Sequence, residues 1–168
     1  MLTGLAPLVS PHTRLLILGS FPGAASLAAQ QYYGHRQNQF WKILQEIWPY
    51  CPMSTGIDSY KIRSEWLLDK KLGLWDVYAA CEREGSLDSS IRQPQVNDFS
   101  QLRLWCPDLR AIAHNGAESY KHARPAQLLG LPVHKLPSTS PANASWSFER
   151  KLAAWREVFE QHGLTDKQ

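Results

Sequence analysis

Long apolar runs are missing from this sequence, and so are the marks of secretion. No apolar stretch in its 168 residues approaches the ~20 residues that a membrane helix needs. Residues 1–11 have neither the basic start nor the apolar stretch of a signal peptide. These two absences argue against a membrane protein and against a secreted one, and we expect a cytoplasmic protein.

Cysteine is also scarce, with three residues that stand far apart: Cys51, Cys81 and Cys106. Their odd number and wide spacing exclude both a disulfide framework and a CxxC metal clip. We therefore expect three reduced thiols, as is usual in the cytosol. The histidines show no zinc-ligand spacing either, so no metal site is predicted.

The sequence also lacks a strong excess of charge of one sign. It has 18 lysines and arginines and 15 aspartates and glutamates, so its formal net charge is +3. This mild positive charge is compatible with a nucleic-acid partner but does not establish one, because only a localised basic patch would matter. The length fits one domain, and no repeat, low-complexity tract or linker divides the chain. We expect a single domain over residues 1–168.

Short apolar runs alternate along the chain with segments of helical periodicity. The runs that predict strands are 14–19, 74–78, 111–115 and 133–136. The segments that predict helices are 26–31, 38–47, 60–71, 98–105, 116–122 and a last helix capped by Ser147. Residues 82–97 are polar and contain Gly85 and Pro94, so they predict a long surface loop.

This alternation predicts an α/β fold, a three-layer α/β/α sandwich around a central, mainly parallel four-stranded sheet. In such sheets ligands bind at the carboxyl ends of the strands. Two loops rich in Ser, Pro, Gly and Asn, 20–38 and 137–145, both follow predicted strands. They can therefore converge on one cleft.

Those two loops also carry a family resemblance. The first contains GSFPG at 19–23 and YYGHRQNQFW at 32–41, and the second contains LPSTSPANA at 136–144. In this order and separation they resemble the uracil-DNA glycosylase superfamily over about residues 14–160. The resemblance is closest to its hypoxanthine-DNA (deoxyinosine) glycosylase branch, which is related to the mismatch-specific uracil/thymine glycosylases.

The resemblance implies a uracil-DNA glycosylase-like fold and a monofunctional DNA glycosylase of base excision repair. Such an enzyme flips a deaminated base out of DNA and hydrolyses its N-glycosidic bond. Hypoxanthine is the expected base, with uracil and xanthine as secondary substrates. The implied partner is DNA that contains deaminated bases, with no metal, no cofactor and no membrane. We expect a monomer that is associated with the nucleoid when it acts on DNA.

One departure from the family pattern concerns the attacking water. Mismatch-specific relatives place an asparagine directly before the proline of the first motif, and here that position is Phe21. The resemblance to the hypoxanthine-removing branch implies that Asn38 takes over the catalytic role. The transition state resembles an oxocarbenium ion, so a water held by a neutral amide suffices. The alternative for Asn38 is a plain helix cap.

The remaining predicted site residues bind the base or the DNA. The resemblance places Tyr33 where relatives have the stacking aromatic, and Asp76 where a carboxylate can accept a hydrogen bond from a ring N–H. The alternative for Tyr33 is an ordinary half-buried loop aromatic, and the alternative for Asp76 is a structural carboxylate. The base-binding residues are Ser20, Phe21, Tyr33 and Asp76. The DNA-binding residues are Gly23, Ser138, Ser140, Pro141, Ala142 and Asn143.

Three residues at or near this site have less certain counterparts in the family: Ala142, His114 and Asn115. Ala142 falls where relatives have a larger apolar wedge, and alanine is a poor wedge. Either Asn143 or a neighbour therefore fills the gap left by the flipped base, or extrusion depends on weak base pairing. The second loop could instead be only a proline-stiffened turn into the last helix. His114 and Asn115, at the end of a predicted strand, are expected to pack or to brace a loop rather than to contact the base.

Two other functions compete with this one. A zinc deaminase needs a His/Cys cluster with a PCxxC-type clip, which the three cysteines do not supply. A non-catalytic nucleic-acid or nucleotide-binding module on the same fold would explain Phe21 in place of a polar residue. Testing duplexes that contain deoxyinosine or deoxyuridine for strand cleavage after alkali would separate the module from the enzyme.

Overall fold

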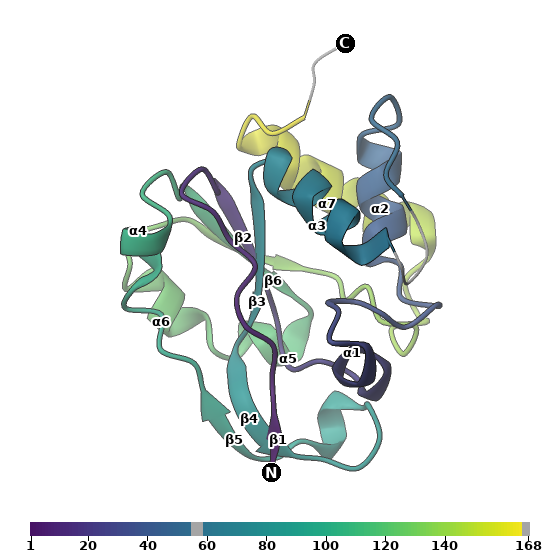
Figure 1. The fold of residues 1–168 in the computed structure, drawn as a ribbon, viewed down its shortest axis with the longest axis vertical. Helices are drawn as coiled ribbons and strands as arrows, with labels where there is room; N and C mark the ends of the chain where they lie inside the picture. Colours follow the sequence, from purple (N-terminus) through teal and green to yellow (C-terminus); the bar gives the residue numbers. More distant parts are fainter. Residues whose placement is uncertain (55–58, 166–168) are drawn as a thin grey trace.

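A parallel sheet of four strands runs through the middle of the computed structural model, which describes residues 1–54 and 59–165 (Figure 1). The strands lie in the order β3 (Leu72–Asp76), β2 (Leu15–Gly19), β6 (Ala111–Asn115) and β7 (Val133–Leu136). Every neighbouring pair is parallel. All residues of β2, β3 and β6 are buried, as expected for strands covered on both faces.

Helices cover both faces of this sheet. The helices α2 (Phe40–Ile47), α3 (Tyr60–Asp69) and α7 (Phe148–Gln161) lie on one side, and α4 (Leu102–Trp105) and α6 (Ala123–Gln127) on the other (Figure 1). Successive residues of β2 serve the two cores in turn: Leu15 and Ile17 join the core under α2 and α7, and Leu16 and Leu18 the core under α4 and α6. The three-layer sandwich predicted from the sequence is confirmed.

A second, smaller sheet corrects the prediction of a long surface loop at 82–97. It is antiparallel and has the order β1 (Leu2–Thr3), β4 (Tyr78–Glu82) and β5 (Arg92–Val96). A short 3-10 helix, η2 (Asp88–Ser90), precedes β5. Every residue of β5 is exposed and one is Pro94, so the strand has no apolar pattern and owes its existence to pairing with β4.

Several predicted boundaries shift in the structure. The strand predicted at 74–78 is divided between β3, which ends at Asp76, and β4. The helix predicted from Asp98 begins only at Leu102, because the Asp98 carboxylate accepts a hydrogen bond from the N–H of Ser100 and forms a turn. The helix predicted at 116–122 is observed as the shorter α5 (Ala117–Tyr120), and α6, which begins at Ala123, is a separate helix that the sequence did not predict.

The predicted helix at 26–31 is shifted in the structure, whereas the predicted cap at Ser147 is observed. The first is observed as α1 (Ala24–Ala29), two residues earlier. The cap of α7 is confirmed, since the N–H of Arg150 donates to the Ser147 hydroxyl at 3.2 Å. Within the described parts of the chain, no helix has the length and apolar character needed to cross a bilayer.

Candidate active site

A cavity of about 740 Å³ opens where the central strands reach their carboxyl ends, a size typical of ligand sites. The loops after β2 and β7, the ends of β3 and β6 and the segment 86–89 form its wall. The two motif loops therefore meet at one cleft, as predicted. Every predicted site residue lines it: Ser20, Phe21, Gly23, Tyr33, Asn38, Asp76, Ser138, Ser140, Pro141, Ala142 and Asn143.

The first loop is held from behind by residues that follow β4. The Ser20 hydroxyl donates to Asp88 at 2.6 Å, and the N–H of Ala24 donates to the Ser86 hydroxyl at 2.9 Å. The guanidinium of Arg83 donates to the carbonyl oxygen of Pro22. The loop at 20–24 is therefore tied at three points to a segment about 60 residues further along the chain.

Phe21 contributes to this loop mainly by anchoring it. Its ring is 6% exposed and packs in the core under α4 and α6, although the residue also borders the cavity. The guanidinium of Arg83 lies over the ring at 5.3 Å. A phenyl ring in this position has no polar atom with which to orient a water molecule.

Asn38 lies just before α2, between the two motif loops. Its side-chain oxygen accepts a hydrogen bond from the N–H of Phe40 at 3.0 Å, which forms a turn over the start of α2, although the N-cap position itself is Gln39. Because an N–H can donate only to the oxygen, this bond fixes which end of the amide is which. The second lone pair of that oxygen and the amide NH₂ remain for another partner.

The two loops are joined directly beside Asn38. The N–H of Gln39 donates to the carbonyl oxygen of Thr139 at 3.0 Å. Lys151, which is buried in α7, donates to the side chain of Gln39 at 3.0 Å. The position of Asn38 relative to the second loop is thus set by hydrogen bonds.

Tyr33 projects into the cavity from a strained backbone. Its φ of 54° lies in the left-handed region, which bulky residues rarely adopt and which often marks functional sites. The ring packs on Phe40 with centroids 4.1 Å apart. The preceding Tyr32 anchors the turn by donating from its hydroxyl to the carbonyl oxygen of Ala6 at 2.7 Å.

The hydroxyl of Tyr33 is buried and has no hydrogen-bond partner. Burial, followed by the nearby charge of Asp76, raises the pKa of Tyr33, and the amide of Asn115 moderates the rise without reaching hydrogen-bond geometry. The hydroxyl therefore keeps its proton and remains a donor.

Asp76 ends β3 at the floor of the cavity. The residue is 4% exposed and its Oδ2 atom has no partner, while the Asn97 amide holds its backbone carbonyl at 2.8 Å. Burial, and then the charge of Asp88, raise the pKa of Asp76 to about 7, against the opposing effect of Arg83. Near neutral pH this carboxyl group can both accept and donate a proton.

Gly19 allows these two unpartnered groups to meet. A Cβ atom at this position would collide with the Asp76 carboxyl group and lie 3.2 Å from the Tyr33 hydroxyl. The chain thus leaves two buried polar groups facing the same space. Buried polar groups normally have partners, so these two atoms remain available to a polar group that enters this part of the cavity.

The second loop is pinned at its centre to the end of β6. The amide of Asn115 donates to the Thr139 hydroxyl and accepts from the Thr139 N–H, each at 3.0 Å. Further turns within the loop use Ser138 and Ser140 as acceptors for backbone N–H groups. Asn115 therefore braces the loop, as the sequence predicted.

His114 has the packing role that the sequence predicted. It lies outside the cavity wall and contacts Ser119, whose hydroxyl donates to the carbonyl oxygen of Leu18 at 2.7 Å. The Ser119 oxygen can then only accept, so Nδ1 of the ring carries the proton. Burial lowers the pKa of His114 to about 4, and the ring is neutral at physiological pH.

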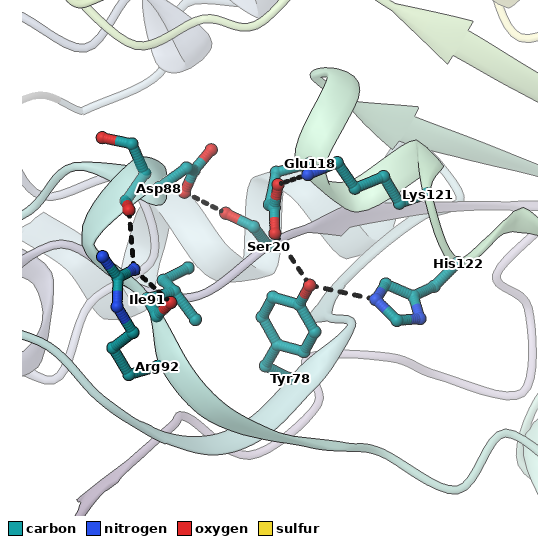
Figure 2. A network of polar contacts seen from close by, with 9 residues as sticks. Ser20, Tyr78, Asp88, Ile91, Arg92, Glu118, Lys121 and His122 are labelled. Carbon is teal, nitrogen blue, oxygen red and sulfur yellow. Dashed lines mark hydrogen bonds and ion pairs between the residues drawn. The ribbon is translucent and has the colours of Figure 1, made fainter.

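A polar network lies behind the first loop (Figure 2). The hydroxyl of Tyr78, at the start of β4, donates to Glu118 at 2.9 Å and contacts Nε2 of His122 at 3.0 Å. Glu118 also pairs with Lys121 at 2.6 Å. These bonds fasten α5 and the turn after it to the small sheet, which in turn carries Ser86 and Asp88.

The family of the chain follows from comparison with known proteins. A model of the uracil DNA glycosylase superfamily matches residues 6–159. The chain belongs to the uracil DNA glycosylase superfamily.

Two relatives in this superfamily are named hypoxanthine DNA glycosylase. One, from Methanosarcina barkeri, is 36% identical over 160 residues that cover 94% of this chain and 98% of the relative. The other, from Methanosarcina acetivorans, is 35% identical over 156 residues that cover 93% and 96%. A candidate uracil DNA glycosylase from M. acetivorans, solved by NMR, has a TM-score of 0.82 and 34% identity, and the match covers 96% of this chain and 98% of that one.

One segment beside the cavity, from Arg83 to Ser89, was not predicted from the sequence. It lies in the stretch read as a surface loop, and Ser86, Leu87, Asp88 and Ser89 all line the cavity. No motif marks the segment, and its contacts reach residues more than 60 positions away. The only local signal is the turn-forming run of serines and aspartate after Gly85.

Metal chemistry was not predicted for this site. Among residues 1–54 and 59–165, no group of three or more His, Cys, Asp or Glu side chains could hold a metal ion. The three cysteines are free thiols.

Proposed function

We propose that this protein is a monofunctional DNA glycosylase that removes hypoxanthine from deoxyinosine in DNA, with uracil and xanthine as secondary substrates, in base excision repair. The similarity to two proteins named hypoxanthine DNA glycosylase supports this substrate. The observation that carries the proposal is the oriented amide of Asn38 in the wall of the cavity between the two motif loops.

The amide of Asn38 holds the attacking water. Its oxygen, already fixed by Phe40, accepts a hydrogen bond from the water and keeps it near C1′ of the sugar. The water oxygen bonds to C1′, the C1′–N9 bond breaks, and its electron pair stays on the base. The water loses a proton to solvent and the departing base gains one. The transition state resembles that of glycoside hydrolysis, so a strong base is not needed.

The floor of the cavity binds the base. Hypoxanthine, xanthine and uracil share a ring N–H beside a carbonyl oxygen. The carboxylate of Asp76 accepts from the N–H, and N–H groups of the loop that contains Ser20, Phe21 and Gly23 donate to the carbonyl oxygen. When Asp76 is ionised, adenine is disfavoured, because it has a bare ring nitrogen in place of that N–H and the lone pair of this nitrogen would face the carboxylate. The ring of Tyr33 provides the stacking surface.

The second loop binds the DNA strand. Ser138 and Ser140 contact phosphates, and Pro141, Ala142 and Asn143 lie against the backbone next to the extruded nucleotide. Contacts of this kind position the duplex without reading its sequence. We include in the proposal that residues 1–168 act as one domain, as a monomer, without a metal or cofactor, in the cytoplasm and at the nucleoid.

Replacing Asn38 with alanine tests the proposal. Turnover on a duplex with one deoxyinosine should fall at least about 100-fold while DNA affinity changes little, since the lost contact serves the transition state. Excision is measured as alkali-sensitive strand cleavage under single-turnover conditions, with deoxyuridine and deoxyxanthosine duplexes alongside.

The matched control is Gln37→Ala, an exposed side chain one position away, which should excise like the wild type. Near-normal turnover of Asn38→Ala would remove Asn38 from the catalytic role. Binding of lesion-bearing DNA by the wild type without cleavage of any of the three duplexes would instead favour a non-catalytic module.

A further inference from the structure

One exposed apolar side chain stands at the rim of the cavity. Leu87 is 56% exposed and lines the cavity. Among the large apolar side chains that are exposed in the described parts of the chain, no other lines it. Exposed leucines are common on protein surfaces, so the informative feature is the place of this one beside the proposed base pocket.

The backbone on both sides of Leu87 is anchored. The hydroxyl of Ser86 accepts from the N–H of Ala24 at 2.9 Å. Asp88 accepts from the hydroxyl of Ser20 at 2.6 Å (Figure 2). The N–H of Ser90 donates to the carbonyl oxygen of Leu87 at 3.0 Å in the turn of η2. A leucine on such a fixed backbone loses little conformational freedom on binding.

An extruded base leaves a gap in the DNA stack, and DNA-bending proteins fill such gaps with apolar side chains such as leucine. In the second loop, the side chains that line the cavity before Trp146 are small or polar: Ser138, Thr139, Ser140, Pro141, Ala142 and Asn143. Trp146 is larger, but it is partly buried and the guanidinium of Arg150 covers one face of its ring at 4.2 Å, whereas Leu87 is exposed.

We propose that Leu87 is the side chain that enters the DNA stack and keeps the target nucleotide extruded. The inference rests on the proposed base excision. It assigns to the segment between β4 and β5 a direct role in opening the duplex, in the wall of the same cavity that the loop with Asn143 lines. The Ser86 and Asp88 bonds then couple the wedge to the loop that receives the base.

The test compares Leu87→Ala with the wild type on two substrates, a deoxyinosine-containing duplex and the same strand alone. Because a single strand has little stacking to open, the wedge matters mainly on the duplex. Burial of a leucine side chain corresponds to a roughly ten- to 150-fold effect, so single-turnover excision from the duplex should fall by that factor. The loss on the single strand should be several-fold smaller.

Three comparisons make the result specific. Leu104→Ala, a change at an exposed leucine of α4 away from the cavity, should excise from both substrates like the wild type. Leu87→Met should recover most of the duplex activity, since methionine has a similar volume. A bulky aromatic nucleotide opposite the lesion, which fills the gap from the DNA side, should restore the activity of Leu87→Ala.

A second readout does not depend on turnover. The fluorescence of a 2-aminopurine placed next to the deoxyinosine should increase when Asn38→Ala protein binds the duplex, because the adjacent hypoxanthine base leaves the stack. Adding Leu87→Ala should remove most of that increase. If Leu87→Ala lost excision activity equally on the duplex and on the single strand, or on neither, the wedge role of Leu87 would be wrong. The proposed base excision would be unaffected by that result. Absence of excision by the wild type from both substrates would overturn the proposed function itself.

Discussion

Replacing Asp76 with asparagine should stabilise the protein, and by an amount that depends on pH. Burial, and then the charge of Asp88, raise the pKa of Asp76 from 3.8 to about 7 in the folded protein. The unfolded chain releases this proton near pH 4, so the folded state binds more protons between about pH 4 and 7, and its stability falls as the pH rises through that window. A pKa difference of about three corresponds to about 4 kcal/mol.

The expected difference between the two proteins follows from the same values. At pH 8 Asp76 is ionised in both the folded and the unfolded wild type, and its raised pKa lowers the free energy of unfolding by the full value of about 4 kcal/mol. At pH 5 the corresponding loss is only about 2 kcal/mol. Asparagine has nearly the same shape and no charge. The free energy of unfolding of the wild type should therefore lose about 2–3 kcal/mol more than that of Asp76→Asn between pH 5 and pH 8.

Urea unfolding at both pH values measures this difference by linear extrapolation. Asp69→Asn, a change at an exposed carboxylate of α3, is the matched control. Its free energy of unfolding should differ from that of the wild type by about the same amount at both pH values. Suppose that the difference in free energy of unfolding between Asp76→Asn and the wild type is the same at pH 5 and pH 8 to within about 1 kcal/mol. Asp76 then does not carry a buried, unpaired charge at neutral pH.

Two further outcomes are expected. Tyr33→Ala should weaken productive binding of deoxyinosine DNA by roughly five- to 150-fold, since stacking on an aromatic ring contributes about 1–3 kcal/mol per base; an unchanged KM and kcat would make Tyr33 purely structural. Gly19→Ala should destabilise the fold by about 1–3 kcal/mol in thermal or urea unfolding, because its Cβ meets the Asp76 carboxyl group, whereas a Cβ at Gly23 would meet Ser86 only at an ordinary 3.5 Å. Equal unfolding free energies for Gly19→Ala and Gly23→Ala would contradict this packing.

The central sheet could be predicted because its strands are locally distinctive. The residues of β2 and β6 form apolar runs closed by small or polar residues, and strands buried on both faces require such runs. Since parallel strands in one sheet expose their carboxyl ends at the same edge, the meeting of the two motif loops followed as well.

The small antiparallel sheet could not be predicted in the same way. The residues of β5 are all exposed and include Pro94, so their sequence is that of a loop. Its ladder with β4, an interaction between separate segments of chain, makes it a strand. The segment 83–89 depends on this sheet for its position, and its contribution to the cavity was missed for the same reason.

The sequence by itself determined the layered α/β fold, the two loops that face one another and the residue types at the site. These features follow from local periodicity and from motifs whose spacing is visible along the chain. Only the tertiary structure decided that Oδ2 of Asp76 and the Tyr33 hydroxyl lie buried without partners near Gly19, and that Leu87 lies at the edge of the cavity. Burial and pairing depend on which distant segments pack together, and no local pattern contains that information.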